Sequence, residues 1–198
     1  MPANLVPHLR ATLSQGSPPP TPAAVLIALT PTPQGEHVIL AKRAEHLRLH
    51  AGEIAFPGGK REPTDQSVWD TALREAWEET ALEPASVERL GILQPLVTRT
   101  GIELTPCVGR LLVAADLQPN PEELALLFAA PLAFFADKSN VTFQQFEYRG
   151  RQRQVPSYQW QQHRIWGVTA AMLAMLANHA LDAGIALESY WRGSSDRL

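Results

Sequence analysis

Residues 73–80 predict a helix that is apolar on one side and acidic on the other. Helix signals begin at Thr64 or Asp65, either of which could cap the helix, and continue to about Thr80. At about 100° per residue, three carboxylates share one face, and the opposite face is apolar and should pack against the core. The carboxylates are Glu75, Glu78 and Glu79, and the apolar face includes Trp69 and Trp77.

The glutamates repel one another if the helix is a purely structural element. Glu75 and Glu79 are like charges four residues apart, which costs roughly 0.2–0.5 kcal/mol. All three also lie in the C-terminal half of the helix, where the helix dipole disfavours anions. A divalent cation would turn this repulsion into a binding site, and carboxylates without His or Cys suit Mg²⁺ or Mn²⁺ better than zinc. A solvated acidic face is the alternative.

The chain is mostly predicted strands, with this central helix and another near the C-terminus, which indicates an α+β fold or a mixed sheet between helices. Residues 1–20 form an N-terminal extension that ends in a proline-rich break, and residues 21–198 form a single domain with a loose tail at 193–198. A long polar loop at residues 44–59 is of the kind that often carries function. Strands are expected at 23–29, 37–42, 90–97, 102–112, 142–148 and 151–155, and helices at 5–14, 120–128 and 169–183.

Composition excludes several classes of protein. The 198 residues carry a formal net charge of −3, which argues against a general nucleic-acid coat. The single cysteine, Cys107, permits neither an intramolecular disulfide nor a cysteine zinc site, and fits a reducing, cytoplasmic location. The N-terminus lacks the pattern of a secretory signal, and the longest apolar stretch, 168–177, is too short to span a membrane. We therefore expect neither nucleic-acid nor membrane partners.

The acidic segment resembles the Nudix box. That pattern is Gly-x5-Glu-x7-Arg-Glu-U-x-Glu-Glu-x-Gly-U, where U is aliphatic, and its core Arg-Glu-x-x-Glu-Glu is intact from Arg74 onward. This chain departs from it in three ways. Asp65 replaces a glutamate, one extra residue precedes Arg74, and Ala81 stands where glycine normally ends the helix.

A second motif resembles the signature of the coenzyme A pyrophosphatase branch of the Nudix hydrolases. That signature is Leu-Leu-Thr-x-Arg-Ser-x3-Arg-x3-Gly-x3-Phe-Pro-Gly-Gly. Here Ala41 and Ala44 replace the Thr and Ser, and the likeness extends over roughly residues 23–178. The positions that match are Arg43, Arg48, Gly52 and the run Phe56-Pro57-Gly58-Gly59.

The resemblance implies a mixed sheet sandwiched between helices (α/β/α) and metal-dependent hydrolysis of coenzyme A to 3′,5′-ADP and 4′-phosphopantetheine. Glu75, Glu78 and Glu79 would bind Mg²⁺ or Mn²⁺ with the carbonyl of Gly59, and Arg74 would hold the glutamates in place. The substrate would be bound by Arg43, Arg48, Gly52, Phe56 and Gly58.

Several roles stay open at this stage. Asp65 would support the loop or cap the helix, His50 would touch substrate or be structural, and Glu123 would be a further ligand or a residue in the first turn of a short helix. The alternative substrates are ADP-ribose, NADH and diadenosine polyphosphates, and a non-catalytic nucleotide sensor is a weaker alternative. The chain would act as a monomer or a homodimer.

Overall fold

The computed structural model describes residues 5–16, 20–112, 115–148 and 151–187. The strands of its main sheet are β1 (Ala23–Thr32), β2 (Gly35–Arg43), β3 (Ile54–Ala55), β4 (Gly58–Lys60), β5 (Val87–Ile92), β6 (Leu96–Val97), β7 (Glu103–Leu111) and β8 (Leu124–Pro131). They run in the order β3-β2-β1-β7-β5, while β4, β6 and β8 pair with β1, β7 and β2. The sheet is mixed, because β1 is parallel to β7 and antiparallel to β2.

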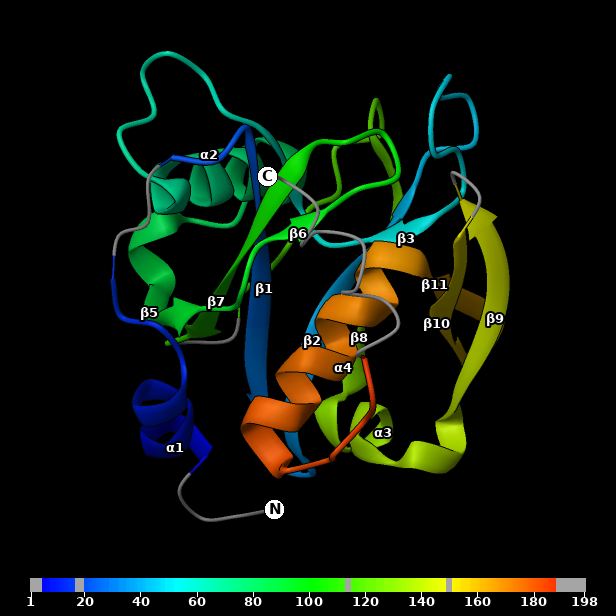
Figure 1. The fold of residues 1–198 in the computed structure, drawn as a ribbon. Coiled ribbons are helices and arrows are strands. Elements are labelled where there is room, and N and C mark those ends of the chain that lie inside the picture. The colour runs from blue at the N-terminus through cyan, green and yellow to red at the C-terminus, as the bar shows by residue number, and fades with distance from the viewer. Residues whose placement is uncertain (1–4, 17–19, 113–114, 149–150, 188–198) are drawn as a thin grey trace.

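Helices cover both faces of this sheet, as expected for an α/β/α fold (Figure 1). The helices are α1 (Leu5–Thr12), α2 (Val68–Thr80), α3 (Leu132–Ala136) and α4 (Gly167–Leu181), with short 3₁₀ turns at Pro84–Ser86 and Lys138–Asn140. Successive side chains of a strand point to opposite faces. Leu26 of β1 accordingly packs in the cluster under α2, while the neighbouring Ile27 packs in the larger cluster with α1, α3 and α4.

A three-stranded antiparallel sheet completes the domain. Its strands are β9 (Val141–Tyr148), β10 (Arg151–Trp160) and β11 (His163–Trp166), in the order β11-β10-β9. Tyr158 and Ile165 point inward and are buried in the main core. The predicted hairpin at 142–155 is confirmed, whereas β11 was not expected from the sequence.

The N-terminal segment packs on the domain through its apolar side. Leu5 and Leu9 of α1 and the following Leu13 are buried in the same core cluster as α4. The expected helix at 5–14 is thus confirmed, and it ends two residues earlier, at Thr12. Cys107 is buried in the core, and the tail at 193–198 lies outside the described residues.

Two expectations for the acidic helix are wrong. The helix starts at Val68 and is capped by Ser67, whose side chain accepts a hydrogen bond from the Asp70 amide, so neither Thr64 nor Asp65 is the cap. Trp77 is 53% exposed instead of packing in the core. Four residues advance a helix by about 400°, so Trp77 lies about 40° past the buried Leu73, toward solvent.

The short helix expected at 120–128 is also absent. Residues 121–123 form a turn, and the chain then continues as strand β8. β8 pairs with β2 from Leu124↔Arg43 to Pro131↔His37, and hydrogen bonds along a neighbouring strand outweigh weak local helix signals. In the described part of the chain, no helix is both long and apolar enough to cross a membrane.

Candidate active site

Helix α2 and strand β4 bring the acidic residues against a pair of glycines. β4 pairs antiparallel with the start of β1, with Gly59 opposite Ala24 and Gly58 opposite Val25. Gly58 has a φ of +152°, and a Cβ there would stand 2.5 Å from the carbonyl oxygen of Ala24. Only glycine fits at this point, because its neighbour is fixed backbone.

Each glycine contacts one glutamate of α2. The amide of Gly58 donates a hydrogen bond of 3.0 Å to Oε2 of Glu79. A Cβ on Gly59 would lie 2.5 Å from Oε2 of Glu75, so the carboxylate of Glu75 occupies the space that glycine leaves free. The two glutamates are therefore packed directly on the β4 backbone.

Burial and mutual repulsion raise the pKa of both carboxyls. Glu79 is 3% exposed, and its burial, opposed by the Gly58 amide, raises its pKa to about 8, with Glu123 and Glu75 adding to the effect. For Glu75, burial also raises the pKa, although the nearby Arg74 partly offsets it. Three negative groups thus converge here with too little positive charge to balance them.

Arg74 organises the outer side of the acidic cluster. Its Nε and Nη2 donate to the two carboxylate oxygens of Asp65 at 3.2 and 3.0 Å, and its Nη1 donates to Glu75 and Glu78, each at 3.1 Å. The guanidinium lowers the pKa of the buried Asp65 to about 2. Asp65 also accepts hydrogen bonds from the Glu62 amide and the Thr71 hydroxyl, so it supports the loop before α2 and anchors Arg74.

The donors at this site fit a hard divalent cation. Among the described residues, no three His, Cys, Asp or Glu side chains already surround one point as metal ligands do. The chemistry is nevertheless suitable, because buried carboxylates with raised pKa values are stabilised by a cation, and carboxylate and carbonyl oxygens are the donors that Mg²⁺ and Mn²⁺ prefer. Glu75, Glu79 and the Gly59 carbonyl are the candidate ligands. Glu78, which is more exposed and is bonded to Arg74, is a fourth candidate at the edge of the site.

The two signature arginines lie on and beside the loop between β2 and β3. Arg43, at the end of β2, interacts electrostatically with Glu79, and its Nε is buried without a hydrogen-bond partner in the described structure. Arg48 is exposed on the loop, and the described residues include none that pairs with its side chain. Arg43 thus lies close to the acidic cluster, and the exposed Arg48 is open to an anion at the loop.

The other signature residues shape the backbone. Gly52 has a φ of +68°, and its amide donates to the Arg43 carbonyl at 3.2 Å. Phe56 is 4% exposed and packs in the main core. Contrary to expectation, it therefore anchors the chain beneath the loop and offers no surface to substrate. His50 bonds to Glu53 through Nδ1 at 2.8 Å.

Glu123 is closer to the site than its place in the sequence suggests. It lies on the turn before β8, and its charge acts on both Glu75 and Glu79. The sequence signal for this position was a second pair of acidic residues, Glu122 and Glu123. The short helix expected there offered a structural explanation for the pair.

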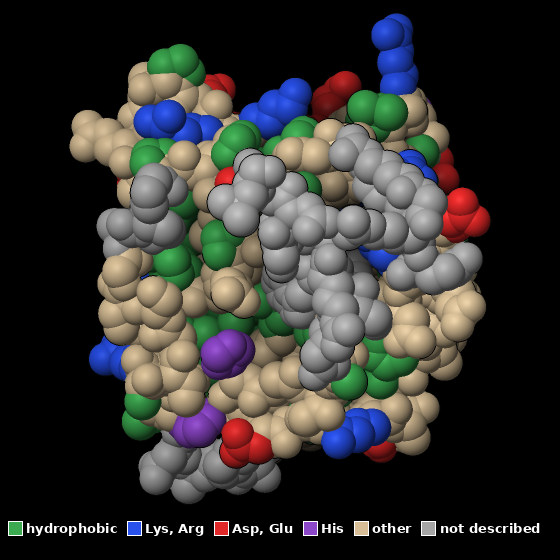
Figure 2. All heavy atoms as spheres, viewed as in Figure 1, with side chains coloured by type: hydrophobic (Ala, Val, Ile, Leu, Met, Phe, Trp, Pro, Cys, Tyr) green, Lys and Arg blue, Asp and Glu red, His purple; other side chains and the backbone are tan. Residues whose placement is uncertain are grey.

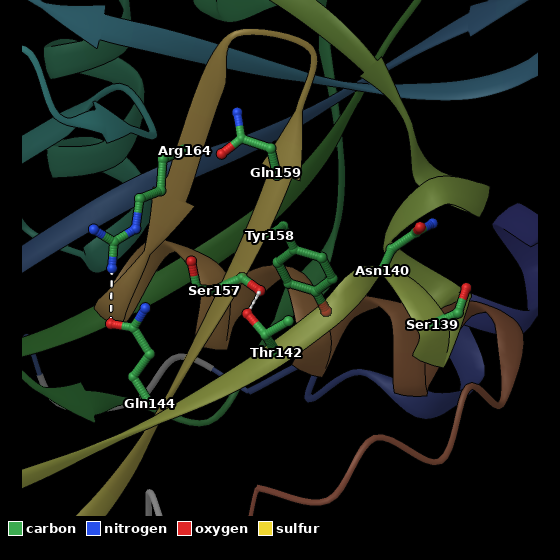
Figure 3. A pocket seen from close by; sticks show the side chains of 8 residues that line it. All are labelled: Ser139, Asn140, Thr142, Gln144, Ser157, Tyr158, Gln159 and Arg164. Carbon is green, nitrogen blue, oxygen red and sulfur yellow. Dashed lines mark hydrogen bonds between the residues drawn. The ribbon is translucent and has the colours of Figure 1, made fainter.

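A polar hollow lies elsewhere, on the outer face of the small sheet (Figure 3). Its volume is about 390 Å³, and Thr142, Gln144, Ser157 and Arg164 are among its lining residues. Arg164 donates to Gln144 at 2.8 Å, and none of the lining residues is a carboxylate. The hollow therefore lacks the groups of the acidic site.

On the face seen in Figure 2, lysines and arginines gather along the upper edge, where Figure 1 places the β2–β3 loop and the β4–α2 loop.

The layered mixed sheet, the glycine strand and the glutamate helix define a class of metal-assisted hydrolases of small nucleotides. A family model described as the NUDIX domain matches residues 20–159, and the chain belongs to the Nudix family. It is a Nudix hydrolase that acts on a nucleoside diphosphate derivative, and enzymes of this family generally use divalent metals such as Mg²⁺ or Mn²⁺.

Several curated relatives bear the description "uncharacterized Nudix hydrolase NudL", and two of them illustrate the similarity. The one from Photorhabdus laumondii is 41% identical over 155 residues, which is 78% of this chain and 82% of the relative. The one from Pectobacterium atrosepticum is 40% identical over 157 residues, covering 78% and 80%. A crystal structure of a MutT/nudix family protein from Enterococcus faecalis superposes with a TM-score of 0.50 at 14% identity, over 92% of this chain and 70% of that one, which shows a shared fold.

Proposed function

We propose that this Nudix hydrolase cleaves the pyrophosphate of coenzyme A or its derivatives, releasing 3′,5′-ADP and 4′-phosphopantetheine. The observation that carries the proposal is that Arg43, at the start of the β2–β3 loop, interacts with the buried Glu79, while Arg48 is exposed on the same loop. Coenzyme A differs from other dinucleotide-like substrates in its 3′-phosphate, which adds a dianionic group outside the pyrophosphate. A guanidinium is well suited to such a group because its forked donors match phosphate oxygens.

The arginines divide naturally between two phosphate groups. Arg43 has an unpartnered buried Nε and interacts with Glu79, so it is suited to the pyrophosphate that lies nearest the cation. Arg48 is exposed on the loop and is suited to the 3′-phosphate at the outer end of the substrate.

The acidic cluster would supply the hydrolytic chemistry. Glu75, Glu79, the Gly59 carbonyl and Glu78 would hold Mg²⁺ or Mn²⁺, which neutralises pyrophosphate charge and lowers the pKa of a bound water. Arg74 holds Glu75 and Glu78 at fixed positions from the side, and the Gly58 amide orients Glu79. One of the three glutamates would also accept the proton of the attacking water.

ADP-ribose, NADH and diadenosine polyphosphates are the second group of candidate substrates. They share the pyrophosphate but lack the 3′-phosphate, so the acidic cluster would act on them without a role for Arg48. We place the domain at residues 21–198 and expect a cytoplasmic monomer or homodimer.

Product analysis tests the proposal. The purified protein is incubated with Mg²⁺ or Mn²⁺ and, separately, coenzyme A, ADP-ribose, NADH and diadenosine tetraphosphate, and the products are identified by mass spectrometry. We expect 3′,5′-ADP and 4′-phosphopantetheine from coenzyme A. Cleavage of another substrate without cleavage of coenzyme A would refute the substrate assignment, and cleavage of none would favour a nucleotide sensor.

A further inference from the structure

The loop at residues 44–52 is closed at its base by main-chain hydrogen bonds. The Gly52 amide donates to the Arg43 carbonyl at 3.2 Å, and the Arg43 amide donates to the Glu53 carbonyl at 3.0 Å. These bonds join the two ends of the loop. They do not by themselves fix the direction in which the loop, with Arg48 on it, projects from the sheet.

Glu45 braces the loop from the side of β2. Its carboxylate forms an ion pair of 2.8 Å with Nζ of Lys42. The same carboxylate lies 2.7 Å from the point where a Cβ on Gly52 would stand. Glu45 thus connects strand β2, which precedes the loop, with Gly52 at the end of the loop.

His46 ties the loop to a different part of the molecule. Its Nε2 donates to the main-chain carbonyl of Glu122 at 3.1 Å, and next to it the Ala44 amide donates to the Glu123 carbonyl at 2.8 Å. Because a carbonyl only accepts, Nε2 carries the hydrogen of this bond.

The turn that His46 contacts is itself fixed to the acidic helix. The Asn120 amide donates to the Glu79 carbonyl at 2.8 Å, and the Gln118 amide donates to the Thr80 carbonyl at 3.0 Å. A continuous set of hydrogen bonds therefore runs from the end of α2, through residues 118–123, to the base of the arginine-bearing loop.

We infer that His46 is a positioning residue for substrate binding, with Glu45 as its partner on the opposite side of the loop. His46 holds the loop at a set distance from the acidic helix, so that Arg48 and the candidate cation ligands bind opposite ends of one substrate. This inference rests on the proposed role of the loop in binding a phosphorylated substrate, whatever that substrate proves to be. Loss of the tie leaves the hydrolytic groups on α2 in place, but the loop must then be ordered each time substrate binds.

Three variants test the role of His46. His46→Ala removes the donor, His46→Gln retains an amide donor that can reach the same carbonyl, and Glu122→Ala removes a neighbouring charge but keeps the carbonyl that accepts the bond. Kinetics are measured on whichever nucleotide the wild-type protein cleaves, so a wrong choice of coenzyme A does not affect the test. We expect His46→Ala to raise KM about three- to tenfold with kcat within twofold, His46→Gln to restore KM, and Glu122→Ala to leave KM unchanged.

Amide hydrogen exchange provides a readout that does not depend on catalysis. We expect the Ala44 and Leu47 amides to exchange several-fold faster in His46→Ala than in the wild type, while the melting temperature changes by no more than about 3 °C. Unchanged KM and exchange in His46→Ala would overturn the inference. A rise in KM for Glu122→Ala equal to that for His46→Ala would also overturn it, because charge rather than the tie would then be responsible.

Discussion

The amide of Gly58 and the carboxylate of Glu79 are joined by a 3.0 Å hydrogen bond across 21 residues of chain. This bond connects strand β4 to the buried side of α2. It supplies one hydrogen bond to a carboxylate that burial would otherwise leave poorly solvated. The glycine pair and the glutamate helix consequently act as one unit.

Replacement of Glu79 by Gln should abolish most of the activity. Glutamine keeps the size of the side chain and an oxygen for the Gly58 amide, but it cannot carry the negative charge that a cation requires. We expect turnover to fall at least a hundredfold at saturating Mg²⁺ while the far-ultraviolet circular dichroism spectrum stays the same. Activity close to wild type would show that the cation site lies elsewhere.

The same variant should be more stable than the wild type at alkaline pH when no divalent cation is present. The folded-state pKa of Glu79 is raised to about 8 from an ordinary value of 4.5, so the folded protein binds the proton more tightly than the unfolded chain. Stability from this group is present below pH 4.5 and is lost as the pH rises toward 8. We expect Glu79→Gln to gain about 3–4 kcal/mol at pH 8 relative to pH 5, measured by urea unfolding in EDTA.

Addition of millimolar Mg²⁺ provides the control for that measurement. The cation should stabilise the wild type and not the variant, because only the wild type retains the charge. An advantage of the variant that is equal at both pH values would contradict the raised pKa of Glu79.

Gly59→Ala should disrupt the acidic site without unfolding the protein. The new Cβ would stand 2.5 Å from Oε2 of Glu75. The glutamate can move away, because its carboxylate is the end of a flexible side chain and not fixed backbone. We expect at least a tenfold loss of kcat/KM together with a higher Mg²⁺ concentration for half-maximal activity. Gly16→Ala is the matched control, since its Cβ would meet only Ser14 Oγ at 3.7 Å. Equal activity of Gly59→Ala and Gly16→Ala would remove Glu75 from the cation site.

Asp65→Asn should destabilise the protein at neutral pH and not in strong acid. Arg74 lowers the pKa of Asp65 to about 2 from 3.8, so the ionised form stabilises the fold above pH 3.8 and this contribution is lost as the pH falls through 2. We expect a loss of about 2 kcal/mol at pH 7, and wild type and variant should converge near pH 2. Urea titrations at several pH values, with the exposed Asp116→Asn as control, provide the measurement. A deficit that persists at pH 2 would indicate a packing effect.

Arg48→Ala should weaken the binding of coenzyme A more than that of dephospho-coenzyme A. Removal of an exposed guanidinium that binds only the 3′-phosphate affects only the substrate that carries this group. We expect KM for coenzyme A to rise at least tenfold and KM for dephospho-coenzyme A to change less than threefold. Equal increases for the two substrates would assign Arg48 to the pyrophosphate or to the loop itself.

Much of the site follows from local sequence. The spacing of Glu75 and Glu79 alone places both on one helix face, and the glycines before the helix mark a close backbone approach. The β1–β2 hairpin and the C-terminal helix also follow from apolar periodicity and from the turn at 31–35. These features depend on neighbours a few residues apart, which a single sequence displays.

Other features depend on which segments meet in space. Strand β8 follows from its pairing with β2, Trp77 is exposed because it lies about 40° around the helix from the buried Leu73, and Asp65 is an anchor because Arg74 reaches it from nine residues away. Glu123 joins Glu75 and Glu79 through chain folding alone. The sequence by itself determined the acidic helix and the clustering of its carboxylates. The tertiary structure decided which outlying residues reach that helix, because burial and long-range hydrogen bonds outweigh local preferences of a few tenths of a kcal/mol.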